Sequence, residues 1–351
     1  MQRRPFLRLA GLTTLSGLLG RGRTAVAAAA PPARQPRPTT RGDGGWSFVL
    51  LPDTQCYSES HPEVFRSQTE WIVRQREARN IRFALHLGDI TDDNVHPQWE
   101  NAWQAMDVLR RDGLPFLMVP GNHDLGPWGS ASDRTSHMSD YFIQRNAMVP
   151  GRSENAYLPI TIGESKLLIV GLEFGPRDAV VEWANKVVAR HPDHHAMLLT
   201  HAYLYSDDTR YDWGTRGRDQ SWNPNGYGVA TDPAQVPHGV NDGEALWRKL
   251  VSRHPQFAFT FNGHVLNDGI GHLVSKGAGG RDVHQMLVNY QCGTQPDRKR
   301  GGGGFLRLMS VQPDGRTVEI ADYSPYYDQW LTDPDRKFTI TLDRSLNAPV
   351  R

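Results

Sequence analysis

The sequence has only two cysteines, Cys56 and Cys292, among 351 residues. A scaffold built from several disulfides is therefore excluded, while a single bridge between these two residues and two separate thiols both stay open. Outside the N-terminus no apolar run is long enough to cross a bilayer, so we expect no membrane anchor. The glycine run 301–304 lacks the Lys-Ser/Thr pair of a phosphate-binding P-loop and predicts a loop that enters a strand at Phe305.

The first thirty residues have no acidic side chain and carry five arginines. Arg3-Arg4 precedes a mildly apolar run over 9–19, and Ala25-Val26-Ala27 supplies the small residues that a signal peptidase accepts. This pattern resembles a twin-arginine export signal over 1–30; the alternative is a disordered basic tail. Residues 31–45, rich in Pro, Arg, Thr and Gly, predict a flexible linker. We therefore expect a secreted or periplasmic protein that the twin-arginine machinery exports.

Positive charge is scarce in the rest of the chain. Without the five leader arginines, 34 basic residues stand against 38 acidic ones, a net charge of −4. A mildly acidic chain without a basic run argues against nucleic acid as the main partner. The remaining 300 or so residues contain no second linker and no repeat, which predicts one domain over 46–345.

Five apolar segments are each followed, within a few residues, by an Asp, Asn or His residue. Each segment has the length and composition of a buried strand. The strands are expected at 46–51, 81–87, 115–119, 196–199 and 257–261, followed in turn by Asp53, Asp89, Asn122, His201 and His264.

Helical periodicity fills the intervals between these strands, at 62–78, 98–111, 178–190 and 244–253. Alternating strands and helices predict mostly parallel sheets with helices on the outside. Ligands in such folds bind beyond the carboxyl ends of the strands, where all five polar residues lie. Any one of them alone would be a turn or surface residue, but five in this order predict a site.

Carboxylate, amide and imidazole groups together offer mixed oxygen and nitrogen ligands. This set suits one or two divalent ions such as Mn, Fe, Zn or Mg better than Ca, and needs no thiolate. A carboxylate shared between two ions would form a clamp that acidifies a bound water and neutralises a phosphoryl oxygen.

The ordered motifs are similar to those of the calcineurin-like metallophosphoesterase superfamily. Gly-Asn-His-Asp after an apolar strand is the most specific of them. The resemblance covers residues 46–342 and implies a four-layer α/β/β/α sandwich. Its motifs in this chain are Asp53-Thr54-Gln55, Gly88-Asp89-Ile90-Thr91-Asp92, Gly121-Asn122-His123-Asp124, His201 and Gly263-His264.

The resemblance also implies a role for each site residue. Asp89 would bridge two ions, and Asp53 would belong to the first. The second ion would be completed by Asn122, His201 and His264. His123 would be a proton donor or charge stabiliser, oriented by Asp92.

Two positions depart from the family pattern. Gln55 stands where the first motif usually has histidine, and Leu266 stands where the last motif usually has its second histidine. The first ion would then keep Asp53, Asp89 and the Gln55 amide oxygen, unless Asp268, His272 or His284 substitutes.

The pattern predicts hydrolysis of a phosphate monoester or diester by a metal-bound hydroxide, acting on a small phosphorylated substrate. The alternative is a non-catalytic binding protein that keeps the fold and one metal. Residues 203–242 lack periodicity and start two residues after His201, so we expect them to border the site. Candidate substrate contacts in this segment are Tyr205, Arg210, Tyr211, Trp213 and Arg216. Glu173 is expected to be structural.

Overall fold

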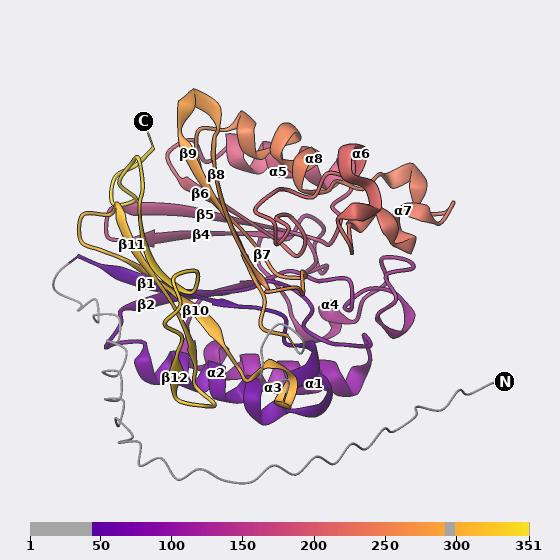
Figure 1. Cartoon of the computed structure of the whole chain (residues 1–351), viewed down its shortest axis with the longest axis horizontal. Helices are drawn as coiled ribbons and strands as arrows, with labels where there is room; N and C mark the ends of the chain where they lie inside the picture. The colour runs from indigo at the N-terminus through magenta and orange to yellow at the C-terminus, as the bar shows by residue number, and fades with distance from the viewer. Residues whose placement is uncertain (1–43, 292–298, 351) are drawn as a thin grey trace, which may run out of the picture. The chain divides into compact units, whose positions relative to one another are not determined.

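The computed structural model describes residues 44–291 and 299–350. All the elements below belong to one compact unit, residues 35–351 (Figure 1). The expected leader over 1–30, the linker up to residue 43 and Cys292 lie outside the described residues, and their predictions are untested.

Two mixed β-sheets form the centre of this unit. The first sheet has the strand order β12-β11-β10-β1-β2-β3, with β13 paired to β11, and the second has the order β4-β5-β6-β7-β9-β8. The strands of the first sheet are β1 (Trp46–Leu51), β2 (Ile81–His86), β3 (Phe116–Met118), β10 (Leu306–Val311), β11 (Thr317–Ser324), β12 (Gln329–Trp330) and β13 (Lys337–Thr341). Those of the second are β4 (Ala156–Ile162), β5 (Ser165–Leu172), β6 (His195–Thr200), β7 (Phe257–Asn262), β8 (Ile270–Lys276) and β9 (Asp282–Val288).

The strands β1, β6, β7 and β10 are buried along their whole length, whereas the edge strands β4, β8, β12 and β13 are partly exposed. Along β1, Phe48 and Leu50 join the core between the two sheets, whereas Val49 and Leu51 pack with residues of the helices. Successive side chains of a strand point to opposite faces, and here both faces are covered. The sequence therefore shows uninterrupted apolar runs instead of an alternation of apolar and polar residues. The sheets therefore need a cover on both outer faces.

Helices supply this cover. Residues of α2 and α3 pack on the first sheet, and residues of α5 and α8 pack on the second, as Figure 1 shows from bottom to top. The predicted four-layer α/β/β/α sandwich is thus confirmed. The α-helices are α1 (Gln55–Ser60), α2 (Pro62–Gln75), α3 (His96–Asp112), α4 (Met138–Tyr141), α5 (Asp178–Ala189), α6 (Trp213–Arg216), α7 (Gly228–Thr231) and α8 (Gly243–Lys249). Short 3-10 helices occupy Pro127–Gly129, Gly217–Asp219, Pro224–Gly226, Val236–His238, Val251–Arg253, Ala278–Gly280 and Lys299–Gly302.

The expectation of mostly parallel sheets was wrong. Among the described strands, five pairs are parallel and six are antiparallel. Four of the five parallel pairs are joined by helical crossovers, including β1–β2, β2–β3 and β6–β7, whereas β7 and β9 are connected through β8. The C-terminal strands β10 to β13 follow one another through short turns, which permit only antiparallel pairing. The five site-bearing strands all belong to the parallel part.

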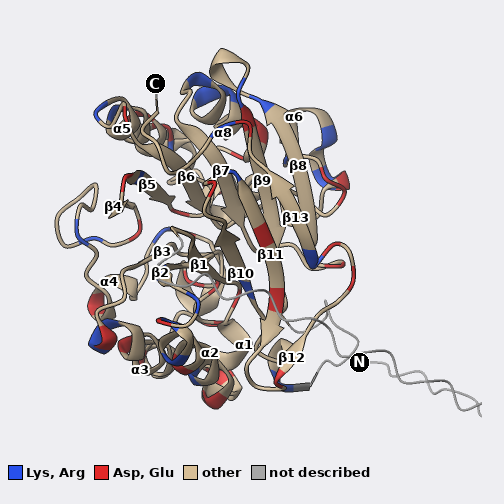
Figure 2. Ribbon diagram, turned by 90° about the vertical axis from the view of Figure 1, so that its left-hand side faces the viewer, with Lys and Arg blue, Asp and Glu red and all other residues tan. Residues whose placement is uncertain are grey.

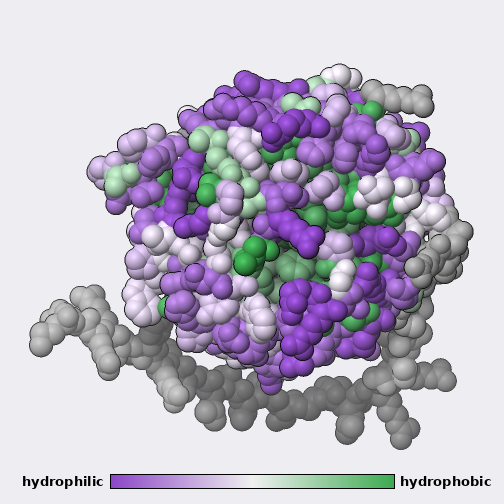
Figure 3. All heavy atoms as spheres, turned by 180° about the vertical axis from the view of Figure 1, so that it is seen from behind, coloured by the Kyte–Doolittle hydropathy of each residue, from purple (hydrophilic) through white to green (hydrophobic). Residues whose placement is uncertain are grey.

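The outer surface is polar and of mixed charge. Lys and Arg alternate with Asp and Glu over the outer helices (Figure 2), and hydrophobic residues on the face in Figure 3 form small patches between hydrophilic ones. Within the described ranges, we find no helix with the length and apolarity needed to traverse a bilayer.

Candidate metal centre

The loops that follow β2, β6 and β7 bring three predicted ligands together. One ligand atom from each of Asp89, His201 and His264 lies within 4.8 Å of the others, and all three residues are buried. Asp89 comes from the first sheet and the two histidines come from the second. Ends of parallel strands from two facing sheets therefore meet at one point, as the sequence predicted.

The two imidazoles have their N–H groups committed to main-chain carbonyls. His201 Nδ1 lies 2.9 Å from the oxygen of Leu87, and His264 Nε2 lies 2.7 Å from that of Trp222. A carbonyl only accepts, so each of these nitrogens carries the proton and the other nitrogen carries a lone pair. The remaining nitrogens, His201 Nε2 and His264 Nδ1, lie 3.2 Å apart, and Asp89 Oδ1 is 3.1 Å from the first of them. Three acceptors thus converge, which requires either an additional proton or a cation between them.

Further buried acceptors surround this group. Asp53 Oδ2, Gln55 Oε1 and Asn122 Oδ1 are buried and have no hydrogen-bond partner. The other oxygen of Asp53 accepts from the main-chain N–H of His264 at 2.9 Å and lies 4.0 Å from His201 Nε2. Buried polar atoms without partners are rare in folded proteins. A cluster of hydrogen-bond acceptors with no donor among them is the kind of ligand set that binds a divalent cation. The residues present therefore fit one.

The electrostatics of the group also call for positive charge. Burial, with the neighbouring Asp89, raises the pKa of Asp53 to about 8, even though His201 opposes this. Burial disfavours a charged His201, but Asp89 beside it raises its pKa to about 9. Burial also disfavours ionisation of Asp89, but His201 holds its pKa below the usual range. These shifts favour added protons within the metal-free group, and a bound cation would displace them, as metals do when they compete with protons for ligands.

Two motif glycines are required by the close approach of these carboxylates. A Cβ on Gly121 would lie 2.1 Å from Asp89 Oδ1, and one on Gly263 would lie 2.0 Å from Asp53 Oδ2. Real Cβ atoms do not approach so closely, so only glycine fits at either position. The motifs therefore combine a ligand with the glycine against which another ligand packs.

The ligand loops have strained backbones. Asp53, Asp89 and His264 have φ values of 28°, 49° and 76°, a region that residues with side chains rarely adopt. Such conformations cost about 1–3 kcal/mol each and cluster at functional sites. The chain thus gives up local stability to point these three side chains at one another.

The residues around the first metal position differ from the family pattern. Gln55 Nε2 donates to Asp89 Oδ2 at 3.1 Å, so the amide N–H, and not the oxygen, faces the carboxylate. Leu266 lines the same cavity as Asp89 and His264. The structure places the three possible replacement ligands elsewhere: Asp268 is exposed and caps its own turn, and His272 contacts His284 at 3.1 Å.

His123 lies at the edge of the group, with about a third of its side chain exposed. Its Nδ1 lies 2.8 Å from the main-chain oxygen of Asp92 and 3.4 Å from the Asp92 carboxylate. The orientation expected from the Asp92 side chain is therefore provided mainly by its carbonyl group. Burial opposes a charge on His123, but Asp89 and this carbonyl raise its pKa above the usual value.

Asp124 was part of the recognised motif but was given no role from the sequence. It is fully buried and accepts hydrogen bonds from the main-chain N–H groups of Ile90, Thr91 and Gly121. These bonds tie the loop after β2 to the loop after β3. The last residue of Gly-Asn-His-Asp is thus a positioning residue for Asp89 and Asn122. The motif itself was the sequence signal that could have identified it.

The segment over 203–242 borders the site, as expected, but through other residues than predicted. Trp222 and Tyr227 line the cavity of about 60 Å³ that contains Asp89 and His264. Their role had no sequence signal, because the segment is irregular. Four of the five predicted contacts have other partners: Arg210 binds Glu244, Tyr211 is buried and donates to Ser221, Arg216 pairs with Asp207, and Tyr205 packs on Tyr211. Trp213 lines a neighbouring cavity that shares Trp222 and Tyr227 with this one.

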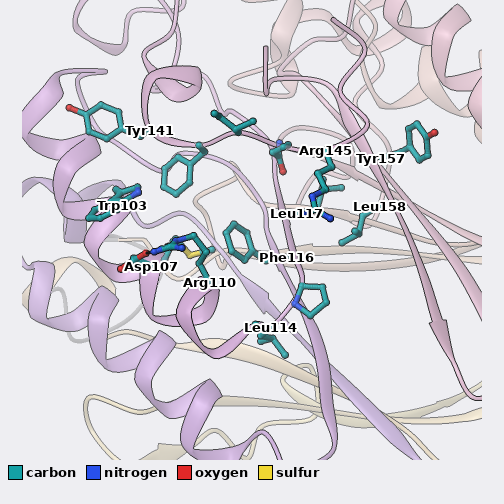
Figure 4. Close-up of a pocket in the computed structure, with 16 residues that line it drawn as sticks. Trp103, Asp107, Arg110, Leu114, Phe116, Leu117, Tyr141, Arg145, Tyr157 and Leu158 are labelled. Atoms are coloured by element: carbon teal, nitrogen blue, oxygen red, sulfur yellow. Dashed lines mark hydrogen bonds and ion pairs between the residues drawn. The ribbon is translucent and has the colours of Figure 1, made fainter. Parts of the chain in front are cut away.

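A cavity of about 480 Å³, larger than the pocket beside Asp89, is lined by other residues (Figure 4). Side chains of α3, β3 and β4 line it, among them Trp103, Phe116 and Leu158. It contains none of the predicted metal ligands, so cavity size does not identify the site in this chain.

Glu173 is structural, as expected. Its carboxylate is buried, forms ion pairs with Arg134 at 3.2 Å and Arg177 at 2.7 Å, and accepts from Asn155 at 2.9 Å.

Comparison with known proteins agrees with this fold and donor set. Residues 47–270 match the family model of the calcineurin-like phosphoesterases, and the chain belongs to that family. The family binds divalent metals, and the buried Asp and His residues described above are suited to hold them.

A curated relative is YvnB of Bacillus subtilis (strain 168), an uncharacterized protein that is 29% identical over 313 residues. The match covers 85% of this chain but only 22% of that protein, so the chain spans about a fifth of its relative.

Two solved structures also resemble the chain. One is the purple acid phosphatase PPD1 from yellow lupin (Lupinus luteus) seeds, with 14% identity and a TM-score of 0.49, covering 87% of this chain and 56% of that one. The other is GAP50, the anchor in the inner membrane complex of Plasmodium, with 10% identity and a TM-score of 0.45, covering 87% and 91%.

Proposed function

We propose that this protein hydrolyses a phosphate ester with the help of one or two divalent ions. Asp53, Asp89, Asn122, His201 and His264 would hold them. The observation that carries the proposal is the pair of imidazole nitrogens, His201 Nε2 and His264 Nδ1, that face each other at 3.2 Å beside Asp89 while the other nitrogen of each ring donates to a main-chain carbonyl. Mixed oxygen and nitrogen ligands favour Mn, Fe or Zn, with Mg as a further candidate.

Divalent ions in such a site polarise a phosphoryl oxygen and acidify water. The chain's own residues provide the positioning. The carbonyls of Leu87 and Trp222 fix the two imidazoles, and the Gln55 amide holds one oxygen of Asp89. His123, whose pKa is raised above the usual value of an imidazole, lines the cavity and is placed to give a proton to a leaving oxygen.

The size of the cavity supports a small reacting group. About 60 Å³ beside Asp89, Asn122 and His123 suits a phosphoryl group and excludes a bulky one. The rest of the substrate would extend outward past Trp222. A monoester and a diester both satisfy this geometry, so both belong to the proposal.

The test is turnover of a panel of monoesters and diesters by metal-stripped protein to which Mn, Fe, Zn or Mg is returned. Activity should disappear with the metal and return with at least one ion. Asp89→Asn, which keeps the volume but removes the shared charge, should abolish it. His272→Gln changes an imidazole away from the site and should retain it. Unchanged turnover in stripped protein would refute the proposal.

A second candidate is a non-catalytic, metal-containing binding protein. The observation in its favour is that Gln55 and Leu266 take the places of two imidazoles around the first metal position. It predicts that metal binds but that no ester in the panel is turned over.

We also propose that the protein acts outside the cytoplasm after export by the twin-arginine machinery. Arg3-Arg4 and the small residues over 25–27 support this. A precursor with Arg3→Lys and Arg4→Lys should remain unprocessed in the cytoplasm, as fractionation and immunoblotting would show. Normal export of that precursor would contradict the proposal, while a Lys substitution at Arg21 serves as the control.

A further inference from the structure

A second cavity lies next to the metal pocket. It has a volume of about 330 Å³, and its lining includes Trp213, Arg218 and Gly226. It also shares Trp222 and Tyr227 with the metal pocket. These two aromatic side chains therefore lie where the two cavities meet, so a group bound in the larger one would be close to the ligands Asp89 and His264.

Three aromatic rings give this cavity its chemistry. Trp213, Trp222 and Tyr227 come from one irregular segment between β6 and α8. Indole and phenol rings bind flat aromatic groups by stacking, which is weaker for puckered rings of the same size. The volume is at the lower end for ligand pockets, roughly 300–1,000 Å³, and suits a single ring system.

The position of Trp222 is tied to the metal centre. Its carbonyl oxygen accepts from His264 Nε2 at 2.7 Å, and its φ of 63° is strained for a residue with a side chain. Its side chain remains 38% exposed although it is a large hydrophobic group. The same residue thus orients a metal ligand with its backbone and presents an uncovered ring beside it.

Uncommitted polar groups accompany these rings. Among the described residues, the hydroxyl of Tyr227 has no hydrogen-bond partner, and burial raises the pKa of Tyr227 further above the ordinary value of a phenol. It therefore stays a donor at any physiological pH. Arg216 is paired with Asp207, whereas the exposed Arg218 forms no ion pair with a described residue. A donor and a free cation beside aromatic rings suit an anionic ligand with a flat ring.

We propose that this cavity is a ring subsite, which selects phosphate esters carrying a flat aromatic group, aryl or nucleobase, on the esterified alcohol. This inference rests on the proposed function and names its substrate class. The phosphoryl group would occupy the small metal pocket, and the ring would lie between Trp213 and Trp222.

The test compares benzyl phosphate with cyclohexylmethyl phosphate, two esters with similar leaving groups that differ in the flatness of the ring. The wild type should prefer the benzyl ester in kcat/KM by roughly tenfold, since base–aromatic stacking is worth about 1–3 kcal/mol. Trp213→Leu should remove this preference by lowering kcat/KM for the benzyl ester alone. Trp213→Phe should restore most of it. Trp103→Leu, the same change of residue type in the unrelated large cavity, should leave it intact.

A second variant guards against misfolding of Trp213→Leu. An added Cβ on Gly226 would lie 3.9 Å from the Trp213 ring, an ordinary contact, so Gly226→Ala should narrow the cavity without strain. This variant should lower kcat/KM for the benzyl ester selectively. Equal hydrolysis of the two esters by the wild type, or an equal loss on both in the variants, would overturn the ring subsite.

Binding separates this inference from the proposed function. Phenylphosphonate, which cannot be hydrolysed, should bind the metal-loaded protein more tightly than cyclohexylphosphonate and quench tryptophan fluorescence in a manner that depends on Trp213. If no ester is turned over but this difference holds, the proposed hydrolysis fails and the subsite stands. If esters are turned over without the difference, the subsite fails alone. Comparing a nucleoside 5′-monophosphate with ribose 5-phosphate distinguishes a nucleobase from a simple aryl group.

Discussion

His201 and His264 each give an N–H group to a main-chain carbonyl, and this choice fixes which nitrogen faces the carboxylates. Carbonyl partners of this kind set the tautomer of a metal-binding imidazole and its orientation. One of the two carbonyls belongs to Trp222 in the irregular segment, so the centre depends on a residue that has no recognisable motif. At the scale of residues, the site is therefore larger than its ligand motifs.

His123 gives the first prediction. Its side chain lines the metal pocket but is not among the three residues of the buried ligand group. His123→Asn should keep metal binding and slow hydrolysis of an alkyl phosphate by roughly 10²–10⁴-fold, because a weakly acidic leaving group needs a proton donor. A nitrophenyl ester should lose much less. Steady-state kinetics on both esters and metal analysis of the variant would measure this.

Asp92→Asn is the matched control for His123. Because the carbonyl of Asp92, at 2.8 Å, is the nearer partner of the imidazole, removing the carboxylate charge should cost far less than removing His123. Loss of metal from His123→Asn would make His123 a ligand and contradict the assignment. An equal loss on both esters would indicate charge stabilisation instead of proton donation.

The second prediction concerns the number of ions. Asp89, Asn122, His201 and His264 offer a full set for one ion, whereas the other side has Asp53, Asp89 and an amide that donates to Asp89. Losing even an indirect partner of a ligand costs about 10–100-fold in affinity. Calorimetric titration of stripped protein should therefore show one tight ion and a second that is absent or at least that much weaker.

Restoring an imidazole provides the reverse experiment. Gln55→His with Leu266→His should strengthen the weak ion and leave the tight one nearly unchanged. Two equally tight ions in the wild type would mean that another residue completes the first position.

At the scale of elements, the sequence predicted the parts that repeat a pattern. The five site-bearing strands and the four long helices lie within a few residues of their expected bounds; for instance, the helix expected over 62–78 is α2, Pro62–Gln75. The apolar pattern is strong there because each of these strands is buried between two layers and each helix packs one face on a sheet. Because these strands are parallel, their carboxyl ends lie at the same edge, and the site residues that follow them are brought together there.

The sequence could not predict what depends on long-range contact. The antiparallel strands β10 to β13 have no helix between them to mark the pairing, and β10 joins them to the sheet by pairing with β1, far away in sequence. The strained backbone of Asp53 follows from its contact with His264, 211 residues later. The rings of Trp222 and Tyr227 reach the pocket through an irregular segment, for which no periodicity exists. Local pattern carries none of this information.

Glu173, directly after β5, gives a prediction at this scale. Burial disfavours its charge, but Arg134 and then Arg177 hold the pKa of Glu173 below its usual value. Its contribution to stability is therefore present above the unfolded pKa of about 4.3 and is lost as pH falls below it. Glu173→Gln should lower the free energy of unfolding by about 3–5 kcal/mol at pH 7, because Arg134 is left buried without its partner.

Denaturant unfolding at several pH values would measure this effect. The gap between wild type and Glu173→Gln should narrow as pH falls from 5 towards 3, about where the carboxylate becomes protonated. Glu182→Gln, which removes an exposed partner of Lys186, should leave stability nearly unchanged. A gap that is small at pH 7, or that does not depend on pH, would show that the buried pairs contribute little.

At the scale of the whole molecule, the metal centre joins the two sheets. Asp53, Asp89 and Asn122 follow strands of the first sheet, and His201 and His264 follow strands of the second. The core between the sheets consists of apolar side chains such as Phe48, Leu199 and Phe261. At the end where the strands stop, buried acceptors without donors replace this apolar packing. A cation bound there would hold the two sheets together at the place where the apolar packing between them ends.

Metal removal should therefore destabilise the fold as well as stop catalysis. A ligand that binds only the folded state adds RT ln(1 + [L]/Kd), about 4.1 kcal/mol at a thousandfold excess over Kd. Thermal or denaturant unfolding with and without a chelator should show a loss of this order, which returns when Mn or Zn is added back. Asp89→Asn should make the unfolding midpoint insensitive to chelator and metal alike, whereas His272→Gln should respond as the wild type does. Identical midpoints for wild-type protein with and without metal would mean that no ion links the two sheets, and the assignment of these five residues as its ligands would then have to be abandoned.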